Sequence, residues 1–303
     1  MKVIDAHMHY SNIQSCKLGA MDSGVDFSAG GLKKEYEESN VVSCVCMGIT
    51  ETAPGLTPDK LAESPMWADF DDEPVYMGVC LGLNPHTLDD NALQRAKNAV
   101  AQRVPAAREC SPSELDCSSS ASVHPHGKSV AGFKVYAGYY HVDINDPVYK
   151  PVYKLAADNN LAVAIHCGET YFEGGLLEYS RPIHVDKLAH EFRDLKIIIC
   201  HLGFPWVMEA CEIAIKNPNV YVDISGLAVG GVSLCEYMKS EPLIRDYFRQ
   251  GLLFLNNYKK VIFGTDWPLV PVGAYIEVCK ALIPQDFWED VFYNNAAKVY
   301  NLA

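Results

Sequence analysis

The stretch Lys196-Ile197-Ile198-Ile199-Cys200-His201 carries the clearest structural signal in the chain, an apolar run that ends in a histidine. Its apolar residues are continuous and do not alternate with polar ones. This pattern is typical of a strand covered on both faces of a parallel sheet. Residues 162–167 repeat the pattern, again with a histidine, His166, near the end. Strands of this kind indicate an α/β protein.

Similar short runs recur along the chain, and each is followed by a longer amphipathic or mixed segment. This alternation indicates parallel βαβ units. We predict eight strands, at residues 3–9, 41–49, 75–83, 131–136, 162–167, 196–201, 220–224 and 261–265. We predict helices between some of them at residues 88–103, 148–159 and 206–215.

Eight strands joined by right-handed crossovers close most economically into one (β/α)8 barrel with its helices outside. The length of 303 residues fits a single such domain, residues 1–303. A doubly wound open sheet is the competing architecture. In a barrel, we expect the active site at the C-terminal ends of the strands.

Two segments interrupt the alternation. Residues 50–72 follow the second predicted strand and are rich in Pro, Asp and Glu, so we expect them on the C-terminal face as part of a lid. Residues 104–129 follow a helix and precede a strand, which places them on the opposite face. We predict that they form an insertion loop remote from the chemistry.

The composition excludes several classes of partner. With 38 acidic and 25 basic residues, the formal net charge is −13, the wrong sign for binding nucleic-acid phosphates. No apolar run approaches the ~20 residues that span a bilayer, and no signal peptide is recognisable, so we expect a cytoplasmic protein without membrane contact. The expected partner is a small-molecule substrate, and the sequence leaves a homo-oligomer open.

Histidines stand at the end of the first predicted strand, Asp5-Ala6-His7-Met8-His9. Side chains two residues apart on a strand point to the same face, so His7 and His9 can present two imidazoles to one ion. Alone, this motif is weak evidence, because two histidines are easily packed or solvated. However, four later strands also end in groups that can bind or share a metal, and these are Lys134, His166, His201 and Asp266. Their equivalent places in one barrel favour a shared metal site.

Three imidazoles and a carboxylate suit Zn²⁺ best among common divalent ions, with Mn²⁺ or Fe²⁺ as alternatives. Such an ion with an open coordination position lowers the pKa of bound water toward ~7. Asp266 can accept the proton of that water. His201 can donate a hydrogen bond to negative charge that develops on a substrate oxygen.

Five motifs follow one another along the chain: Asp5-Ala6-His7-Met8-His9, Gly132-Phe133-Lys134-Val135-Tyr136, Ile165-His166-Cys167-Gly168, Cys200-His201-Leu202-Gly203 and Gly264-Thr265-Asp266-Trp267-Pro268. They resemble the ordered motifs of the amidohydrolase superfamily. The chain is most similar to the branch that includes aminocarboxymuconate semialdehyde decarboxylase, resorcylate decarboxylases and pyrone-dicarboxylate lactonase. Residues 292–300 are similar to the terminal helix of that branch, so the resemblance spans nearly the whole chain.

The resemblance implies that His7, His9, His166 and Asp266 bind metal, with His201 as a ligand or a catalytic acid/base. It implies that Lys134 bridges two ions only if it is carbamylated, whereas one ion is commoner in this branch and is what we expect. If Lys134 stays an amine, its cation can pair with a substrate carboxylate. A further candidate anion anchor is Arg181, in the loop after the fifth predicted strand.

The leading hypothesis is a metal-dependent hydrolase that uses metal-activated water on an ester, lactone, amide or C–N bond of a small molecule. Asp266 is then the base and His201 the electrophile or acid. The alternative enzyme is a metal-dependent nonoxidative decarboxylase, a lyase, in which a proton replaces the carbon dioxide of an unsaturated or aromatic acid. A noncatalytic metal- or ligand-binding barrel is the third hypothesis.

Overall fold

The computed structural model describes residues 1–10, 14–48, 76–101, 128–171 and 173–302. One parallel sheet has its strands in sequence order: β1 (Val3–Met8), β2 (Val41–Met47), β3 (Tyr76–Leu83), β4 (Lys128–Val135), β5 (Ala162–Ile165), β6 (Lys196–Ile199), β7 (Val220–Asp223) and β8 (Val261–Ile262). Backbone hydrogen bonds from Asp266 N to His7 O (2.7 Å) and from His9 N to Trp267 O (2.6 Å) join the segment after β8 to β1. The sheet therefore closes into the predicted (β/α)8 barrel, and the doubly wound alternative is wrong.

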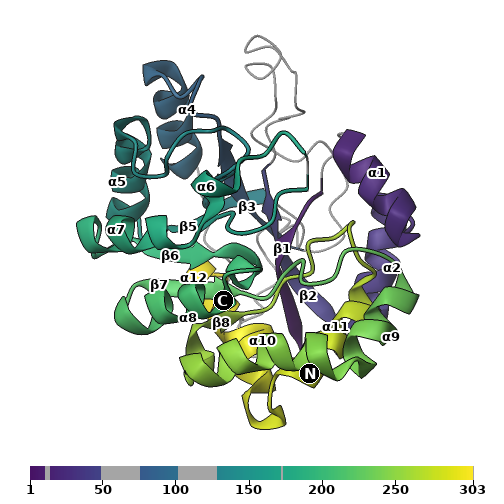
Figure 1. Ribbon diagram of the computed structural model, residues 1–303. Coiled ribbons are helices and arrows are strands. Elements are labelled where there is room, and N and C mark those ends of the chain that lie inside the picture. Colours follow the sequence, from purple (N-terminus) through teal and green to yellow (C-terminus); the bar gives the residue numbers. More distant parts are fainter. Residues whose placement is uncertain (11–13, 49–75, 102–127, 172, 303) are drawn as a thin grey trace, which may run out of the picture.

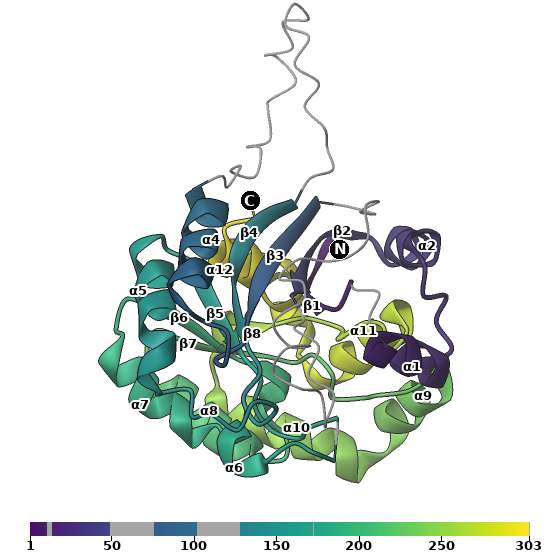
Figure 2. The ribbon, with the colours of Figure 1, turned by 90° about the horizontal axis from the view of Figure 1, so that it is seen from above.

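Helices surround the strands (Figure 1), and the view from above in Figure 2 shows them outside the sheet. The α-helices are α1 (Gln14–Ser23), α2 (Ala29–Ser39), α4 (Asp90–Ala101), α5 (Lys150–Asp158), α6 (Leu177–Ser180), α7 (Ile183–Glu191), α8 (Val207–Lys216), α9 (Val232–Ser240), α10 (Pro242–Leu255), α11 (Val272–Leu282) and α12 (Asn295–Tyr300). Short 3₁₀ helices are η1 (Pro147–Tyr149), η2 (Cys200–Gly203), η3 (Tyr258–Lys260) and η4 (Gln285–Phe287), and η5 (Asp290–Asn294) is a π-helix. None of the helices in the described ranges combines the length and apolar character needed to cross a membrane.

The predicted strands all exist, but their ends differ from the predicted ones by up to three residues, and the last strand ends at Ile262 instead of at residue 265. We placed residues 128 and 129 in the insertion loop, whereas Lys128 and Ser129 pair with Met77 and Gly78 of β3 and begin β4. A polar pair can start a strand because the backbone alone makes the ladder hydrogen bonds. The predicted lid at 50–72, and residues 104–127 of the insertion, lie outside the described residues.

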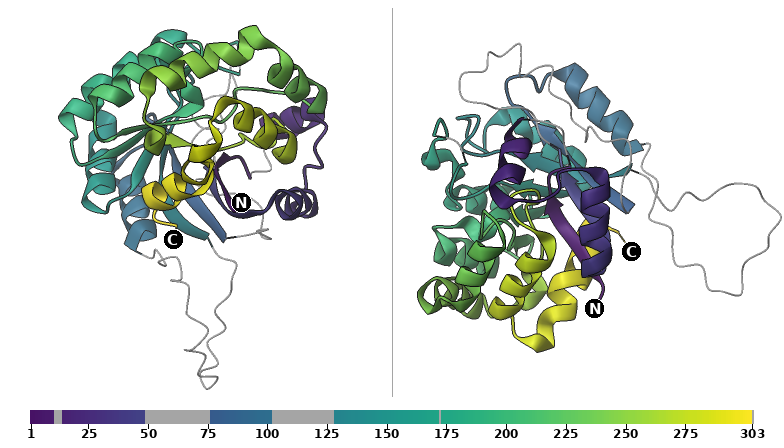
Figure 3. Two further views of the ribbon diagram at one scale, coloured as in Figure 1. Left: turned by 90° about the horizontal axis from the view of Figure 1, so that it is seen from below. Right: turned by 90° about the vertical axis from the view of Figure 1, so that its right-hand side faces the viewer.

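The apolar core has two layers. The larger layer lies between the sheet and the surrounding helices and includes Val163, Ile197 and Val222. The smaller layer fills the barrel interior, where Ala164 and Ile198 pack with Tyr300 of α12. Figure 3 shows α12 close to the N-terminal ends of the strands, so this helix closes one end of the interior. The opposite end is left to polar side chains.

An irregular register in β1 directs its last histidines toward that polar end. Asp5 pairs with Cys44 but Met8 pairs with Cys46, so β1 has one extra residue relative to β2. A bulge of this kind re-aims the side chains that follow it. Ile4 and Ala6 face the interior before the irregularity, and His7 and His9 face it afterwards.

A similar shift occurs between β3 and β4, where Val79 pairs with Val130 and Cys80 with Gly132. A Cβ on Gly132 would lie 2.3 Å from Ala162 O, so only glycine permits this close approach to β5. The extra residue lets β4 direct Lys134 into the interior.

Candidate metal centre

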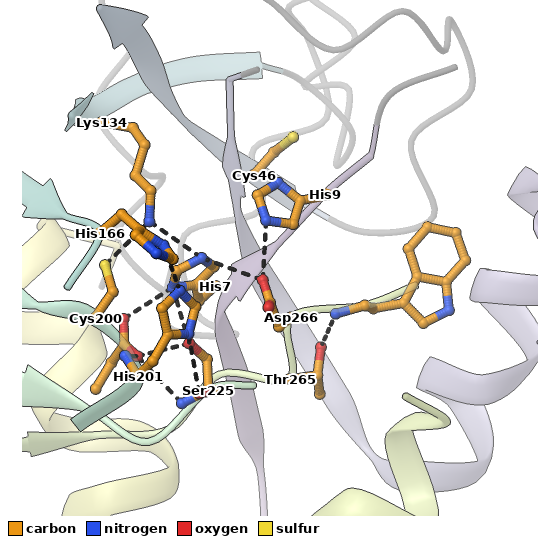
Figure 4. Close-up of polar contacts among 12 residues, drawn as sticks. His7, His9, Cys46, Lys134, His166, Cys200, His201, Ser225, Thr265 and Asp266 are labelled. Carbon is orange, nitrogen blue, oxygen red and sulfur yellow. Dashed lines mark hydrogen bonds and ion pairs between the residues drawn. The ribbon is translucent and has the colours of Figure 1, made fainter. Parts of the chain in front are cut away.

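Two histidines and a carboxylate meet at the C-terminal end of the barrel (Figure 4). His9 Nε2 lies 2.9 Å and His7 Nε2 lies 3.4 Å from Asp266 Oδ1. Asp266 has φ +68°, a left-handed conformation that is uncommon outside glycine. This turn, fixed by the hydrogen bond from Asp266 N to His7 O, points the carboxylate back toward β1.

The donor set fits a divalent ion. Although His9 Nε2 is close, the buried Asp266 Oδ1 accepts no well-aligned hydrogen bond within the described part of the chain. One ligand atom from each of His7, His9 and Asp266 lies within 4.8 Å of the others. Ligand atoms around tetrahedral zinc are roughly 3.3 Å apart, close to the observed separations. These residues would hold the ion through two imidazole nitrogens and one carboxylate oxygen.

The charge states of these groups also suit a metal. Burial raises the pKa of Asp266, but its interactions with the nearby imidazoles of His201, His9 and His7 outweigh this effect, and the net pKa lies well below the usual range. Burial, followed by the nearby Lys134 cation, lowers the pKa of His7 to about 3. An ionised carboxylate and a neutral imidazole are the forms that bind metal ions.

His166 and His201 stand beside this group, with His166 Nδ1 3.1 Å from His201 Nε2. The other ring nitrogens face carbonyl oxygens, which only accept: His166 Nε2 lies 2.9 Å from Glu169 O, and His201 Nδ1 lies 3.1 Å from Ser225 O. Each ring therefore carries its hydrogen on the nitrogen that faces the carbonyl. Burial lowers the pKa of both histidines, so two lone pairs face one another. This arrangement is compatible with both roles predicted for His201, a ligand or an acid/base.

Lys134 lies within the same cluster. Its side chain is 1% exposed, and its Nζ lies 3.3 Å from His7 Nε2 and 3.1 Å from Cys200 Sγ. Its ammonium is also 5.4 Å from the centre of the Tyr136 ring. Lys134 is thus a buried amine directly beside the candidate metal centre.

Arg181 has a different environment from the other predicted residues. Its guanidinium donates to both carboxylate oxygens of Glu209, at 2.9–3.3 Å, and lies over the ring of Trp206. Half of its side chain is exposed. Its positive charge is therefore already paired with a carboxylate of α8, and its contacts are with that helix and not with the histidines.

Two residues that the sequence analysis missed support the histidines. Asp223, at the end of β7, lies 2.8 Å from His7 Nδ1 through its Oδ2. Its Oδ1 accepts the backbone N–H of His201 at 2.9 Å. Ser225 Oγ lies 3.0 Å from both His7 Nδ1 and His201 Nδ1. Asp223 could have been found from the sequence, because it is an acidic residue near the C-terminal end of a predicted strand. The same criterion singled out Asp266.

Comparison with known proteins identifies the class. The family model described as Amidohydrolase matches residues 4–302, so the chain belongs to this family of enzymes. This confirms the resemblance drawn from the five motifs. None of the curated proteins compared with the chain matches it.

Solved structures share the fold. A TIM-barrel protein from Bordetella bronchiseptica is 17% identical with a TM-score of 0.64, covering 100% of this chain and 99% of its own. A probable 2-pyrone-4,6-dicarboxylic acid hydrolase from Acinetobacter baumannii is 13% identical with a TM-score of 0.58, covering 99% and 100%. The 5-carboxyvanillate decarboxylase of Sphingomonas paucimobilis is 14% identical with a TM-score of 0.61, covering 100% and 99%. Both hydrolases and decarboxylases therefore occur on this barrel.

Proposed function

We propose that this chain is a metal-dependent hydrolase that cleaves an ester, lactone, amide or C–N bond of a small molecule. The observation that carries the proposal is the ionised Asp266 carboxylate, whose Oδ1 faces both His7 Nε2 and His9 Nε2 without a well-aligned hydrogen bond. A divalent ion bound there, Zn²⁺ before Mn²⁺ or Fe²⁺, would supply a water of lowered pKa.

The remaining roles, metal binding and proton transfer, belong to residues of the chain. His7, His9 and Asp266 would hold the ion, with His166 and His201 beside them. Asp266 would accept a proton from the attacking water on its carboxylate. His201 presents an unprotonated Nε2, which serves as a ligand or, once it has gained a proton, as an acid toward the leaving group.

Lys134 is proposed to bind an anionic group of the substrate. It is a buried amine beside His7, and a carboxylate brought next to it would be stabilised by an ion pair of low solvent exposure. Relatives of this fold whose names include dicarboxylic acid hydrolase and carboxyvanillate decarboxylase agree with a small carboxylate as substrate. The proposed substrate class is therefore a small carboxylic acid with a hydrolysable bond.

The test uses zinc-loaded protein and a panel of lactones, esters, amides and aromatic carboxylates, each incubated in water labelled with ¹⁸O. Hydrolysis puts the label into the product, and removal of the metal with a chelator should abolish that reaction. Release of carbon dioxide, with hydrogen from solvent in its place and no ¹⁸O incorporation, would instead assign decarboxylation. Metal analysis of the purified protein, expected to give one ion per chain, accompanies the assay.

A further inference from the structure

A serine hydroxyl lies at the centre of a second group of potential ligands. Ser225 Oγ is 3.0 Å from His7 Nδ1, 3.0 Å from His201 Nδ1 and 2.6 Å from Asp223 Oδ1. Atoms of His7, His201 and Asp223 lie within 4.8 Å of one another, a spacing that an ion could fill. The hydroxyl contacts all three residues and connects them through hydrogen bonds. This group is therefore a hydrogen-bond hub.

The position of each hydrogen in this hub follows from its acceptors. The Asp223 carboxylate can only accept, and its Oδ1 already faces the backbone N–H groups of His201 (2.9 Å) and Ser225 (3.1 Å). The Ser225 hydroxyl has one hydrogen, and its shortest contact is with that same oxygen. Its lone pairs are then free to accept from the two imidazoles.

The two histidines must therefore donate from Nδ1. His7 Nδ1 faces Asp223 Oδ2 at 2.8 Å, and that oxygen carries no hydrogen. His201 Nδ1 faces the Ser225 carbonyl oxygen at 3.1 Å as well as the hydroxyl. A neutral imidazole with hydrogen on Nδ1 has its lone pair on Nε2. Those Nε2 atoms face the candidate metal centre, His7 Nε2 toward Asp266 and His201 Nε2 toward His166.

We propose that Asp223 and Ser225 are positioning residues that hold His7 and His201 in the Nδ1–H tautomer, so that both Nε2 lone pairs point to the metal centre. The inference rests on the proposed function only for the use of those lone pairs. The tautomers themselves exist in the metal-free protein and can be measured there. Partners of this kind commonly change metal affinity by about 10–100-fold.

Asp223→Asn is a sharp test because the side chain keeps its shape. The two backbone N–H groups of His201 and Ser225 require an acceptor, so the new amide must keep its oxygen on their side. Its NH₂ group then faces His7 Nδ1, which has to accept instead of donate. His7 is thus forced into the Nε2–H tautomer, and its lone pair turns away from the metal centre.

The experiment is ¹⁵N–¹H correlation spectroscopy of metal-free protein labelled at histidine, with His7 and His201 assigned by single His→Gln variants. Wild-type protein should show both residues as Nδ1–H, and Asp223→Asn should move His7 to Nε2–H. Competition with a chromogenic chelator should show Zn²⁺ affinity about 10–100-fold weaker in Asp223→Asn. Asp186→Asn removes a carboxylate that pairs with Lys216 on the outer surface and should change neither readout.

Two results would overturn the inference: hydrogen on Nε2 of either histidine in the wild type, or an unchanged His7 tautomer in folded Asp223→Asn. If that variant does not fold, the wild-type spectrum still decides. The proposed function fails separately, if zinc-loaded wild type gives no hydrolytic product. That result would not affect the tautomers measured in the metal-free protein.

Discussion

Lys134 Nζ lies 3.3 Å from His7 Nε2, the same nitrogen that faces the Asp266 carboxylate. A neutral imidazole nitrogen with its lone pair exposed can accept from the ammonium or bind a metal ion, but one lone pair cannot serve both. The lysine and a divalent ion therefore compete for His7, and like charges at this distance repel strongly in a buried site. Carbamylation would reverse the relationship, because the modified lysine is anionic and attracts the ion.

Replacement of Lys134 distinguishes these two states. We expect Lys134→Met, which keeps an unbranched side chain one atom shorter and without charge, to bind Zn²⁺ at least about tenfold more tightly, equivalent to about 1.4 kcal/mol. Turnover of a carboxylate substrate should fall, because its proposed partner is lost. Zinc affinity is measured by chelator competition in carbonate-free buffer. Lys154→Met on α5, an exposed lysine, is the control with no expected change. Tighter binding by wild type in added bicarbonate, together with weaker binding by Lys134→Met, would show that the lysine is carbamylated.

Asp266→Asn tests Asp266 as the proton acceptor at a fixed metal occupancy. The backbone N–H of residue 266, which bonds to His7 O, is untouched, so the turn after β8 should persist and circular dichroism should match wild type. The amide is a poor proton acceptor, so turnover should drop by about 10²–10⁴-fold. The assay uses protein with zinc occupancy verified by elemental analysis. Undiminished turnover at full occupancy would show that another group takes the proton.

Most of the fold was readable from the sequence because a parallel barrel repeats one simple pattern. Each strand is an apolar run, as in residues 162–167, and each candidate ligand follows such a run at its C-terminal end. The pairing of His7 with His9 followed from strand alternation alone. The bulge in β1 that makes this alternation point inward was not visible, because it depends on which residues of β2 pair with Asp5 and Met8.

Asp223 and Ser225 show a different limit of prediction from sequence. Asp223 and Ser225 stand in an apolar context much like that of the other strand ends, but their role depends on contacts with His7 and His201 from distant strands. The sequence analysis offered Arg181 as an anion anchor, whereas Glu209 of α8 pairs with it. An ion pair between a loop and a distant helix cannot be recognised from sequence spacing.

The buried Asp5 predicts a pH-dependent stability. Burial raises the pKa of Asp5 to about 6 from 3.8, even though Thr265 and Tyr36 donate hydrogen bonds to its carboxylate. Because the folded pKa is the higher one, the stabilisation from this group is complete below pH 4 and is lost as the pH rises through about 6. The difference between these two pKa values corresponds to about 3 kcal/mol of folding free energy.

Urea unfolding from pH 4 to 7 compares wild type with Asp5→Asn. The free energy of unfolding of wild type relative to the variant should decline by about 2–3 kcal/mol over that range. The exposed Asp194→Asn should follow the wild-type curve in parallel. A constant difference between wild type and Asp5→Asn would show that Asp5 is already ionised at pH 4 in the folded protein.

Lys260 predicts a stability effect far from the metal centre. Its Nζ donates to the carbonyl oxygens of Ala214 (2.5 Å), Asn217 (2.7 Å) and Val220 (3.1 Å), two of which belong to the end of α8 and the turn after it. The last carbonyls of a helix have no partner within the helix, so this ammonium satisfies groups that would otherwise be left without one.

Lys260→Met should lower the free energy of unfolding by about 2–3 kcal/mol. The neighbouring Lys259 is exposed, and Lys259→Met should change it by less than about 0.5 kcal/mol in the same urea titration. Equal effects of the two substitutions would mean that water can replace Lys260 as the hydrogen-bond donor to the three carbonyl oxygens.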